Sequence, residues 1–256
     1  MVHAAKFSAL ALYAVYAWSL FIVLGATTLI LTIVTPSLKA RRSIGGACAR
    51  FWLRLTGIVV DFRDGQLLPE EPAVAIANHS SYLDGILLKA VLPTRYAFVI
   101  KKEMVRIPLA GLLLRRLGAE FVDRFNRHSG AMDARRIMRN AIGGGSLVFF
   151  PEGTFSHRVG LARFHGGAFA IAARSNLPVV PIAIRGARHV LRGDSIVLRP
   201  GRIVVQVLPS VHGGPQHEAH ILRDQSRARI LLALGEPDLA DLDGVAEVAA
   251  RIRERA

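Results

Sequence analysis

The residues best suited to chemistry in this 256-residue chain are a histidine and an aspartate five positions apart, His79 and Asp84. A short apolar run precedes them, and residues 81–91 have the pattern of a helix. If that helix begins after Ser80, His79 lies in the loop and Asp84 in the first turn, so that the two side chains can meet. Asp84 could then hold one imidazole nitrogen while the other accepts a proton from a hydroxyl. This spacing is compatible with a general base.

The same segment has a structural interpretation that the local spacing leaves equally open. Ser81 and Asp84 nearly match a capping box, in which paired side chains satisfy the first N–H groups of a helix. His79 would then be a loop histidine with an ordinary structural hydrogen bond. The place of the segment after a strand bears on function, because ligands of α/β sheets usually bind where strands end.

Two further polar side chains also follow short apolar strands. Arg124 closes such a strand, and a guanidinium there is well placed to bind a phosphate, whose oxygens it matches as a fork. An ordinary surface pair of Asp123 and Arg124 is the alternative. Glu152 stands in a tight turn beside backbone amides that Gly153 leaves accessible, and a solvated turn carboxylate is the alternative there.

The chain around these segments alternates short apolar runs with helical patterns, which is typical of an α/β sheet. The predicted fold class is α/β, a mixed β-sheet flanked by helices. We expect an N-terminal membrane anchor at residues 1–40, the sheet domain at 41–215 and a C-terminal helical extension at 216–256. Strands are expected at residues 57–62, 73–77, 96–100, 120–122, 146–150, 179–184, 195–198 and 202–208, and helices at 81–91, 109–117, 128–142, 167–174 and 216–233.

The N-terminal apolar run, residues 7–38, contains no charged side chain and is long enough to cross a bilayer as one helix. It is long for a signal peptide, whose apolar core Tyr13, Tyr16 and Trp18 would interrupt. A hairpin of two short helices in one leaflet, divided near Gly25, is an alternative. A buried core helix is another, although a helix this long without a polar face is hard to bury in a small domain.

The charge of the chain indicates anionic partners. The net charge is +14, from 33 Lys+Arg against 19 Asp+Glu, which suits nucleic acid or anionic membrane lipids. No nucleic-acid-binding module is recognised, so nucleic acid is not expected. Basic residues gather directly after the apolar run, at Lys39, Arg41 and Arg42, and such flanks stay on the cytoplasmic side. We therefore expect the cell inner membrane, with the catalytic domain facing the cytoplasm.

Neither a metal nor a cofactor is expected. Cys48 is the single cysteine, so no intrachain disulfide and no cysteine-based zinc site can form. His79 and Asp84 lack further ligands at a recognisable metal-binding spacing.

Four segments together resemble, in order and spacing, the glycerolipid acyltransferase family that includes lysophosphatidic acid acyltransferases. The resemblance covers roughly residues 50–210 and rests on Asn78-His79-x4-Asp84, Gly118-x2-Phe121-Val122-Asp123-Arg124, Phe150-Pro151-Glu152-Gly153-Thr154 and Val179-Val180-Pro181-Ile182. It implies that His79 is the general base, that Asp84 orients it and that Arg124 binds the phosphate of the acceptor. The remaining substrate-binding residues it implies are Asn78, Glu152, Gly153 and Thr154.

The reaction implied by this resemblance moves an acyl chain from acyl-CoA or acyl carrier protein to a hydroxyl of a lysophospholipid. Lysophosphatidic acid, giving phosphatidic acid, is the first candidate acceptor. Two departures from the family pattern, Phe155 and His165, stand where basic residues are common, so a lyso-ornithine lipid or lysophosphatidylglycerol is an alternative acceptor. A non-catalytic lipid-binding membrane protein of the same fold is the alternative outside catalysis. Condensation-type enzymes with His-x3-Asp-Gly fit less well, because four residues separate His79 from Asp84.

Overall fold

The computed structural model describes residues 2–123, 127–154, 158–213 and 218–240. Arg124 and Phe155, two of the residues singled out in the sequence, lie outside these ranges. So does most of the segment that follows the last helix.

A seven-stranded sheet in the order β1-β7-β6-β2-β5-β3-β4 is the centre of the described structure. Five strands are parallel to one another, whereas β7 pairs antiparallel with β6 and carries β1 parallel to itself at the edge. The predicted mixed α/β sheet is therefore confirmed. The strands are β1 Val59–Arg63, β2 Val74–Ala77, β3 Tyr96–Lys101, β4 Glu120–Val122, β5 Ser146–Phe149, β6 Val179–Arg185 and β7 Arg202–Val207.

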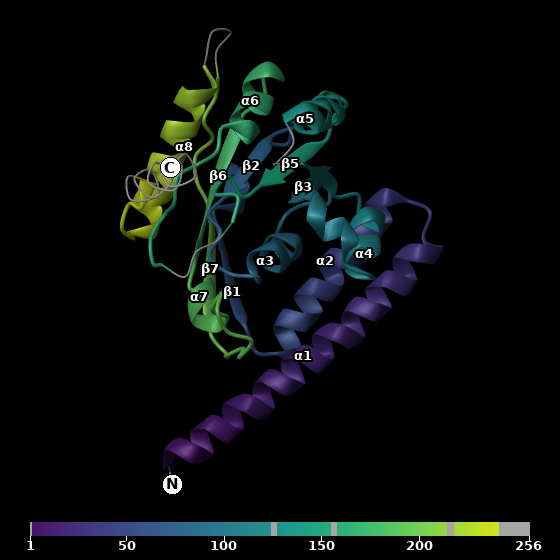
Figure 1. Ribbon diagram of the computed structural model, residues 1–256, viewed down its shortest axis with the longest axis vertical. Coiled ribbons are helices and arrows are strands. Elements are labelled where there is room, and N and C mark those ends of the chain that lie inside the picture. Colours follow the sequence, from purple (N-terminus) through teal and green to yellow (C-terminus); the bar gives the residue numbers. More distant parts are fainter. Residues whose placement is uncertain (1, 124–126, 155–157, 214–217, 241–256) are drawn as a thin grey trace, which may run out of the picture.

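Helices cover both faces of this sheet (Figure 1). Successive side chains of a strand point to opposite faces, and β2 shows the result. Ala75 and Ala77 face a core that includes Leu87 of α3, whereas Val74 and Ile76 belong to a second core under α5, α6 and α8. The helices are α1 Val2–Val34, α2 Leu38–Leu55, α3 Asp84–Val91, α4 Ala110–Arg116, α5 Arg127–Ile142, α6 Gly167–Arg174, α7 Ala187–Val190 and α8 Ala219–Leu234, with 3-10 turns η1 Gly65–Leu67 and η2 Lys102–Arg106.

The strand predicted at residues 195–198 is wrong. The hydroxyl of Ser195 accepts from the backbone N–H of Val197 at 3.0 Å, and the indole N–H of Trp18 donates to the carbonyl of Ile196 at 2.7 Å. These contacts satisfy backbone groups that a strand would use in a ladder. The helix predicted at 81–91 also starts later, at Asp84, because residues 80–83 form the turn that surrounds the Asp84 carboxylate.

The N-terminal apolar run forms one continuous helix, and a second helix not predicted from the sequence follows Pro36. Within the described residues, Ser8–Val34 of α1 is the segment long and apolar enough to cross a membrane. Figure 1 shows α1, in purple, running alongside α2 at the edge of the domain. One side of α1 carries exposed apolar side chains, at Leu12, Val15, Ile22, Val23, Ile30, Ile33 and Val34.

Polar contacts bind the other side of α1 to the rest of the molecule along most of its length. Near the N-terminal end, the Tyr13 hydroxyl donates to the carbonyl of Thr56 at 2.9 Å, and Trp18 donates to the Ile196 carbonyl. Near the C-terminal end, Arg116 Nε donates to the carbonyl of Thr32 at 2.9 Å. These anchor points span roughly 30 Å along the helix. The domain therefore lies beside α1 rather than beyond its end.

Candidate active site

The central strand β2 delivers the Asn78–Asp84 segment to the carboxyl edge of the sheet, between β6 and β5. The side chain of Asn78 is buried and exchanges two hydrogen bonds with Ile184 at the end of β6. Its Nδ2 donates to the Ile184 carbonyl at 2.9 Å, and its Oδ1 accepts from the Ile184 N–H at 2.7 Å. An amide has both a donor and an acceptor, so it can satisfy both backbone groups at once. Asn78 therefore fixes where the loop leaves the sheet.

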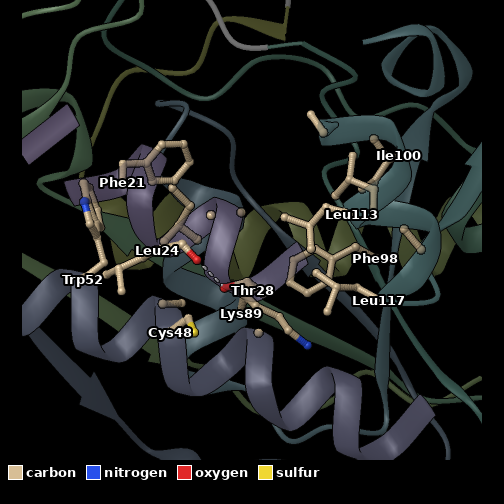
Figure 2. A pocket seen from close by; sticks show the side chains of 18 of the residues that line it. Phe21, Leu24, Thr28, Cys48, Trp52, Lys89, Phe98, Ile100, Leu113 and Leu117 are labelled. Atoms are coloured by element: carbon tan, nitrogen blue, oxygen red, sulfur yellow. Dashed lines mark hydrogen bonds between the residues drawn. The ribbon is translucent and has the colours of Figure 1, made fainter. Parts of the chain in front are cut away.

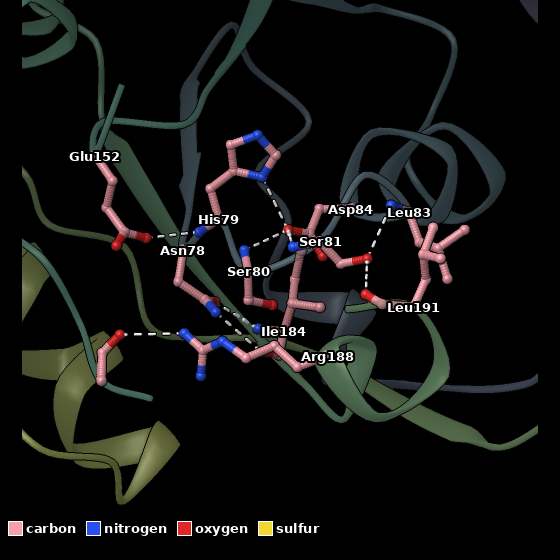
Figure 3. A network of polar contacts seen from close by, with 11 residues as sticks. Asn78, His79, Ser80, Ser81, Leu83, Asp84, Glu152, Ile184, Arg188 and Leu191 are labelled. Atoms are coloured by element: carbon pink, nitrogen blue, oxygen red, sulfur yellow. Dashed lines mark hydrogen bonds and ion pairs between the residues drawn. The ribbon is translucent and has the colours of Figure 1, made fainter. Parts of the chain in front are cut away.

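The two residues expected to act together are in contact. His79 Nδ1 lies 2.9 Å from Asp84 Oδ2, and the Asp84 carboxyl has no exposed surface. The same oxygen accepts the backbone N–H groups of Ser80 at 2.6 Å and Ser81 at 2.8 Å. Three hydrogen-bonding groups thus converge on one carboxylate oxygen. When Nδ1 is the donor in its contact with Asp84, the other ring nitrogen, Nε2, is the one that can accept a proton. Figure 3 shows the other ring nitrogen, Nε2, pointing away from Asp84.

The imidazole plane is fixed by aromatic packing as well. Phe150, at the end of β5, stacks on the His79 ring with centroids 4.2 Å apart and planes inclined by 21°. The side chain of His79 nevertheless keeps 20% of its surface exposed. It is held from two sides and reachable from a third, which is the arrangement that a general base requires.

Glu152 supports the same histidine through its backbone. Its Oε1 accepts from the N–H of His79 at 2.6 Å and its Oε2 from the N–H of Ala162 at 3.0 Å, while 8% of the residue is exposed. Burial opposes the charged form more strongly than these donors favour it, and raises the pKa of Glu152 from its ordinary 4.5 to about 7. Glu152 therefore joins the His79 loop to the loop that contains Ala162.

A second set of contacts holds the Ala162 loop from the C-terminal side. Arg188 in α7 pairs with Glu236 at 2.8 Å and donates to the carbonyl of Gly160 at 3.2 Å. The N–H of Gly160 donates to Glu236 at 3.1 Å. The positive charge of Arg188 also acts on Glu152 and lowers its pKa, against the larger effect of burial, so this ion pair borders the site. Neither Arg188 nor Glu236 lies in a motif, and their pairing over 48 residues could not be read from the sequence.

The structure brings four of the predicted site residues together: Asn78, His79, Asp84 and Glu152. Gly153 occupies the turn after β5 with a φ of +79°, a conformation that favours glycine. Thr154 follows and is exposed. The predicted phosphate ligand Arg124 lies just beyond the described end of β4.

An apolar cavity of about 370 Å³ begins at α3, directly after the catalytic candidate Asp84, and extends between α1, α2, β3 and α4 (Figure 2). A fatty acyl chain needs such a space, because its burial removes hydrocarbon from water. The sequence did not reveal the cavity, since its walls come from segments far apart in the chain. Those walls include Phe21, Leu24, Gly25 and Thr28 of α1, Cys48 and Trp52 of α2, Gly85, Ile86 and Lys89 of α3, Phe98 and Ile100 of β3, and Ala110, Leu113, Leu114 and Leu117 at α4.

Comparison with known proteins gives the class to which this domain belongs. Residues 59–185 match the family model described as Acyltransferase, so this part of the chain is an acyltransferase-family domain. Among its curated relatives, 1-acyl-sn-glycerol-3-phosphate acyltransferase BAT2 from the chloroplast of Brassica napus is 33% identical over 75% of this chain and 56% of its own length. The 1-acyl-sn-glycerol-3-phosphate acyltransferase alpha of Mus musculus is 29% identical over 74% of this chain and 68% of its own length.

A solved structure has the same fold. The crystal structure of the 1-acyl-sn-glycerophosphate acyltransferase PlsC from Thermotoga maritima superposes with a TM-score of 0.71, covering 90% of this chain and 95% of that one, at 22% identity. The chain spans about half the length of the first curated relatives it matches: 56%, 44% and 49%.

Glu152 should make stability depend on pH in a defined direction. The unfolded chain ionises this group near pH 4.5 and the folded protein near pH 7, so the folded state binds more protons between those values. The free energy of unfolding should therefore fall as the pH rises through this window, by up to about 3 kcal/mol from this group. Denaturant unfolding measured between these pH values should show this fall in the free energy of unfolding for wild type. In Glu152→Gln most of the pH dependence should be absent.

Glu71→Gln is the matched control, because Glu71 is exposed. It should keep the wild-type slope. An unchanged slope in Glu152→Gln would show that Glu152 is not the titrating group.

Proposed function

We propose that the chain transfers a fatty acyl group from a thioester to a hydroxyl of a lysophospholipid, with lysophosphatidic acid as the first candidate acceptor and phosphatidic acid as the product. The observation that carries this proposal is the His79–Asp84 contact at 2.9 Å, at a strand end of an acyltransferase domain. The relatives named above are 1-acyl-sn-glycerol-3-phosphate acyltransferases, which supports the choice of acceptor.

In the proposed reaction, Nε2 of His79 removes the proton from the acceptor hydroxyl as its oxygen attacks the thioester carbonyl carbon. The tetrahedral intermediate collapses, the carbon–sulfur bond breaks, and the thiolate takes the proton back from the imidazolium. Asp84 stabilises the imidazolium, because its negative charge lies against Nδ1. The donor is acyl-CoA or acyl carrier protein. The remaining proposed assignments are Arg124 on the acceptor phosphate and Asn78, Glu152, Gly153 and Thr154 in the substrate-binding region.

We infer that the protein acts on a membrane, with α1 lying along its surface. The exposed face of α1 is apolar, whereas the opposite face is bonded to the domain at Tyr13, Trp18 and Thr32. A helix that crossed the bilayer would separate these anchor points from a domain outside it. If α1 lies in a single leaflet, its apolar face contacts lipid while its other face stays bound to the domain. An insoluble lysolipid can then reach the site from the membrane. The proposed location remains the cytoplasmic side of the inner membrane, where the acidic thioester donors are found.

Removal of the proposed base should abolish most turnover. His79→Ala should lower kcat about 10²–10⁴-fold, the usual effect of losing a general base, with little change in thermal stability. Asp84→Asn should lose less than His79→Ala in a thioester-cleavage assay, because its proposed role is orientation. His189→Ala is the matched control, since His189 is exposed on α7. Full activity in His79→Ala would exclude the mechanism, whereas absence of thioester cleavage in wild type would favour the non-catalytic lipid-binding alternative.

The acceptor headgroup is tested by a substrate panel. Charge-assisted hydrogen bonds contribute about 1.5–3 kcal/mol, so Arg124→Ala should lower kcat/KM for lysophosphatidic acid roughly tenfold to a hundredfold, mainly through the acceptor KM. The panel compares this acceptor with lysophosphatidylglycerol and lyso-ornithine lipid. If wild type acylates one of the other two and ignores lysophosphatidic acid, the acceptor proposed here is wrong, and Phe155 and His165 explain the change.

The cavity should set which acyl chains are used. Gly25 lines it, and a Cβ at this position would meet no atom within 4 Å, so the side chain of Gly25→Leu starts in open space and takes volume from the cavity. Loss of room for two methylene groups should lower kcat/KM for long chains about tenfold relative to short ones. Ala26→Leu, at the exposed neighbouring position, should leave kcat/KM unchanged for both long and short chains. Unchanged preferences for the chains of both donor and acceptor would show that the cavity is not an acyl site.

A further inference from the structure

The segment from Lys101 to Arg116, which comprises η2 and α4, forms a corner of the molecule beside the C-terminal end of α1 (Figure 1). The segment is strongly basic, because it contains five basic residues and one acidic residue, Glu103. Lys102 pairs with Asp123 at 3.6 Å, and Arg116 is bound to carbonyls of α1. The other three, Lys101, Arg106 and Arg115, are exposed, and none has an acidic partner among the residues that the structure describes.

The same corner exposes three large apolar side chains, Ile107, Leu109 and Leu112. Leu109 is the most exposed of them at 69%, and its backbone has a φ of +60°, a conformation that leucine rarely adopts. Neighbouring Gly111 is packed so tightly that a Cβ would lie 2.3 Å from the Val105 carbonyl. The backbone of this turn therefore directs a leucine side chain into solvent.

The inner side of α4 lines the apolar cavity described above. Ala110, Leu113 and Leu114 line the cavity, while Leu109 and Leu112 face outward. One short helix thus separates the cavity from the surface. Arg116 connects this helix to α1 through the carbonyls of Thr32 and Ile33, so the corner is held beside the C-terminal end of α1.

We propose that this corner is a second membrane contact, which inserts Ile107, Leu109 and Leu112 into the headgroup region of a bilayer that contains anionic phospholipid. Lys101, Arg106 and Arg115 bind lipid phosphates, because cations beside exposed hydrocarbon match an anionic interface. The proposal rests on the membrane placement of α1 proposed above and adds to it. A single helix in a surface leaves rotation about its axis free, whereas a second contact fixes which side of the domain faces the lipid.

Site-specific fluorescence on the full-length protein tests this contact. Cys48→Ala removes the native thiol, and Leu109→Cys, Ile22→Cys or Leu232→Cys then carries an environment-sensitive dye. Ile22 reports on α1, and Leu232 is an equally apolar control, 86% exposed on α8 beyond the other face of the sheet. With vesicles of phosphatidylcholine containing phosphatidylglycerol and a nitroxide-labelled lipid, the labels at 109 and 22 should shift to shorter wavelength and be quenched, and the label at 232 should not.

The outcomes separate the two proposals. A quenched label at 22 with label 109 in water would overturn the corner contact and leave the α1 placement intact. Label 22 in water would overturn the α1 placement itself. In vesicles of phosphatidylcholine alone, label 109 should be quenched less, and equal quenching in both would overturn the assignment of the three cations to anionic lipid.

The kinetic consequence is specific to acceptor presented in a membrane. Leu109→Asp should lower kcat/KM for a lysolipid embedded in vesicles roughly tenfold, the effect of losing one buried leucine contact with lipid. Its activity on a short-chain, water-soluble lysolipid should match wild type, and Leu232→Asp should match wild type on both. An equal loss on both acceptors in Leu109→Asp would mean a folding or active-site defect and would overturn the proposal.

Discussion

The Asp84 carboxylate has no contact with water, and a buried charge is tolerated only where donors around it replace its hydration. Two backbone N–H groups and one imidazole nitrogen do so here, all on a single oxygen. To reach that oxygen the loop after β2 must turn sharply, and α3 must begin at Asp84 rather than earlier. The ring orientation of His79, the shape of the loop and the first turn of α3 therefore depend on one charge. Asn78 fixes the start of this loop to the end of β6, and Glu152 holds it through the backbone N–H of His79.

Much of the fold and the centre of the site could be predicted from the sequence, because both depend on local patterns. The alternation of apolar runs with helical periodicity gives most strands and helices. The spacing of His79 and Asp84 permits their contact, although it left a capping role equally open. Features that depend on distant partners could not be predicted. Helix α2 contains Gly45 and Gly46, which read as helix breakers, yet a Cβ on Gly45 would press on Leu117 and one on Gly46 on the Lys89 carbonyl. Those glycines permit close packing that only the folded structure reveals.

The N-terminal run shows the same limit in another form. Apolar composition and length are the same for a helix that crosses a bilayer and for one that lies on it. The two arrangements differ in the hydrogen bonds of single polar groups, such as the Tyr13 hydroxyl and the Trp18 indole. In the sequence, these residues indicate only that the apolar core of a signal peptide would be interrupted. Their acceptors, on Thr56 and Ile196, lie 43 and 178 residues away. The hydropathy of a segment indicates that it is suited to an apolar environment. Whether such a helix crosses a bilayer or lies on it depends on its contacts with the rest of the protein.

Contacts made by residues 236–239 form late during synthesis, because these residues follow the rest of the site in the chain. Leu161 exchanges backbone hydrogen bonds with Pro237 and Leu239, and Glu236 closes the ion pair with Arg188 beside the site. These residues are synthesised after α1 and after the segment that carries His79 and Asp84. During translation the membrane-seeking helix is thus complete long before the loop that steadies Glu152 has its final support. A nascent chain can reach lipid early, but the site has all of these contacts only after residue 239 has left the ribosome.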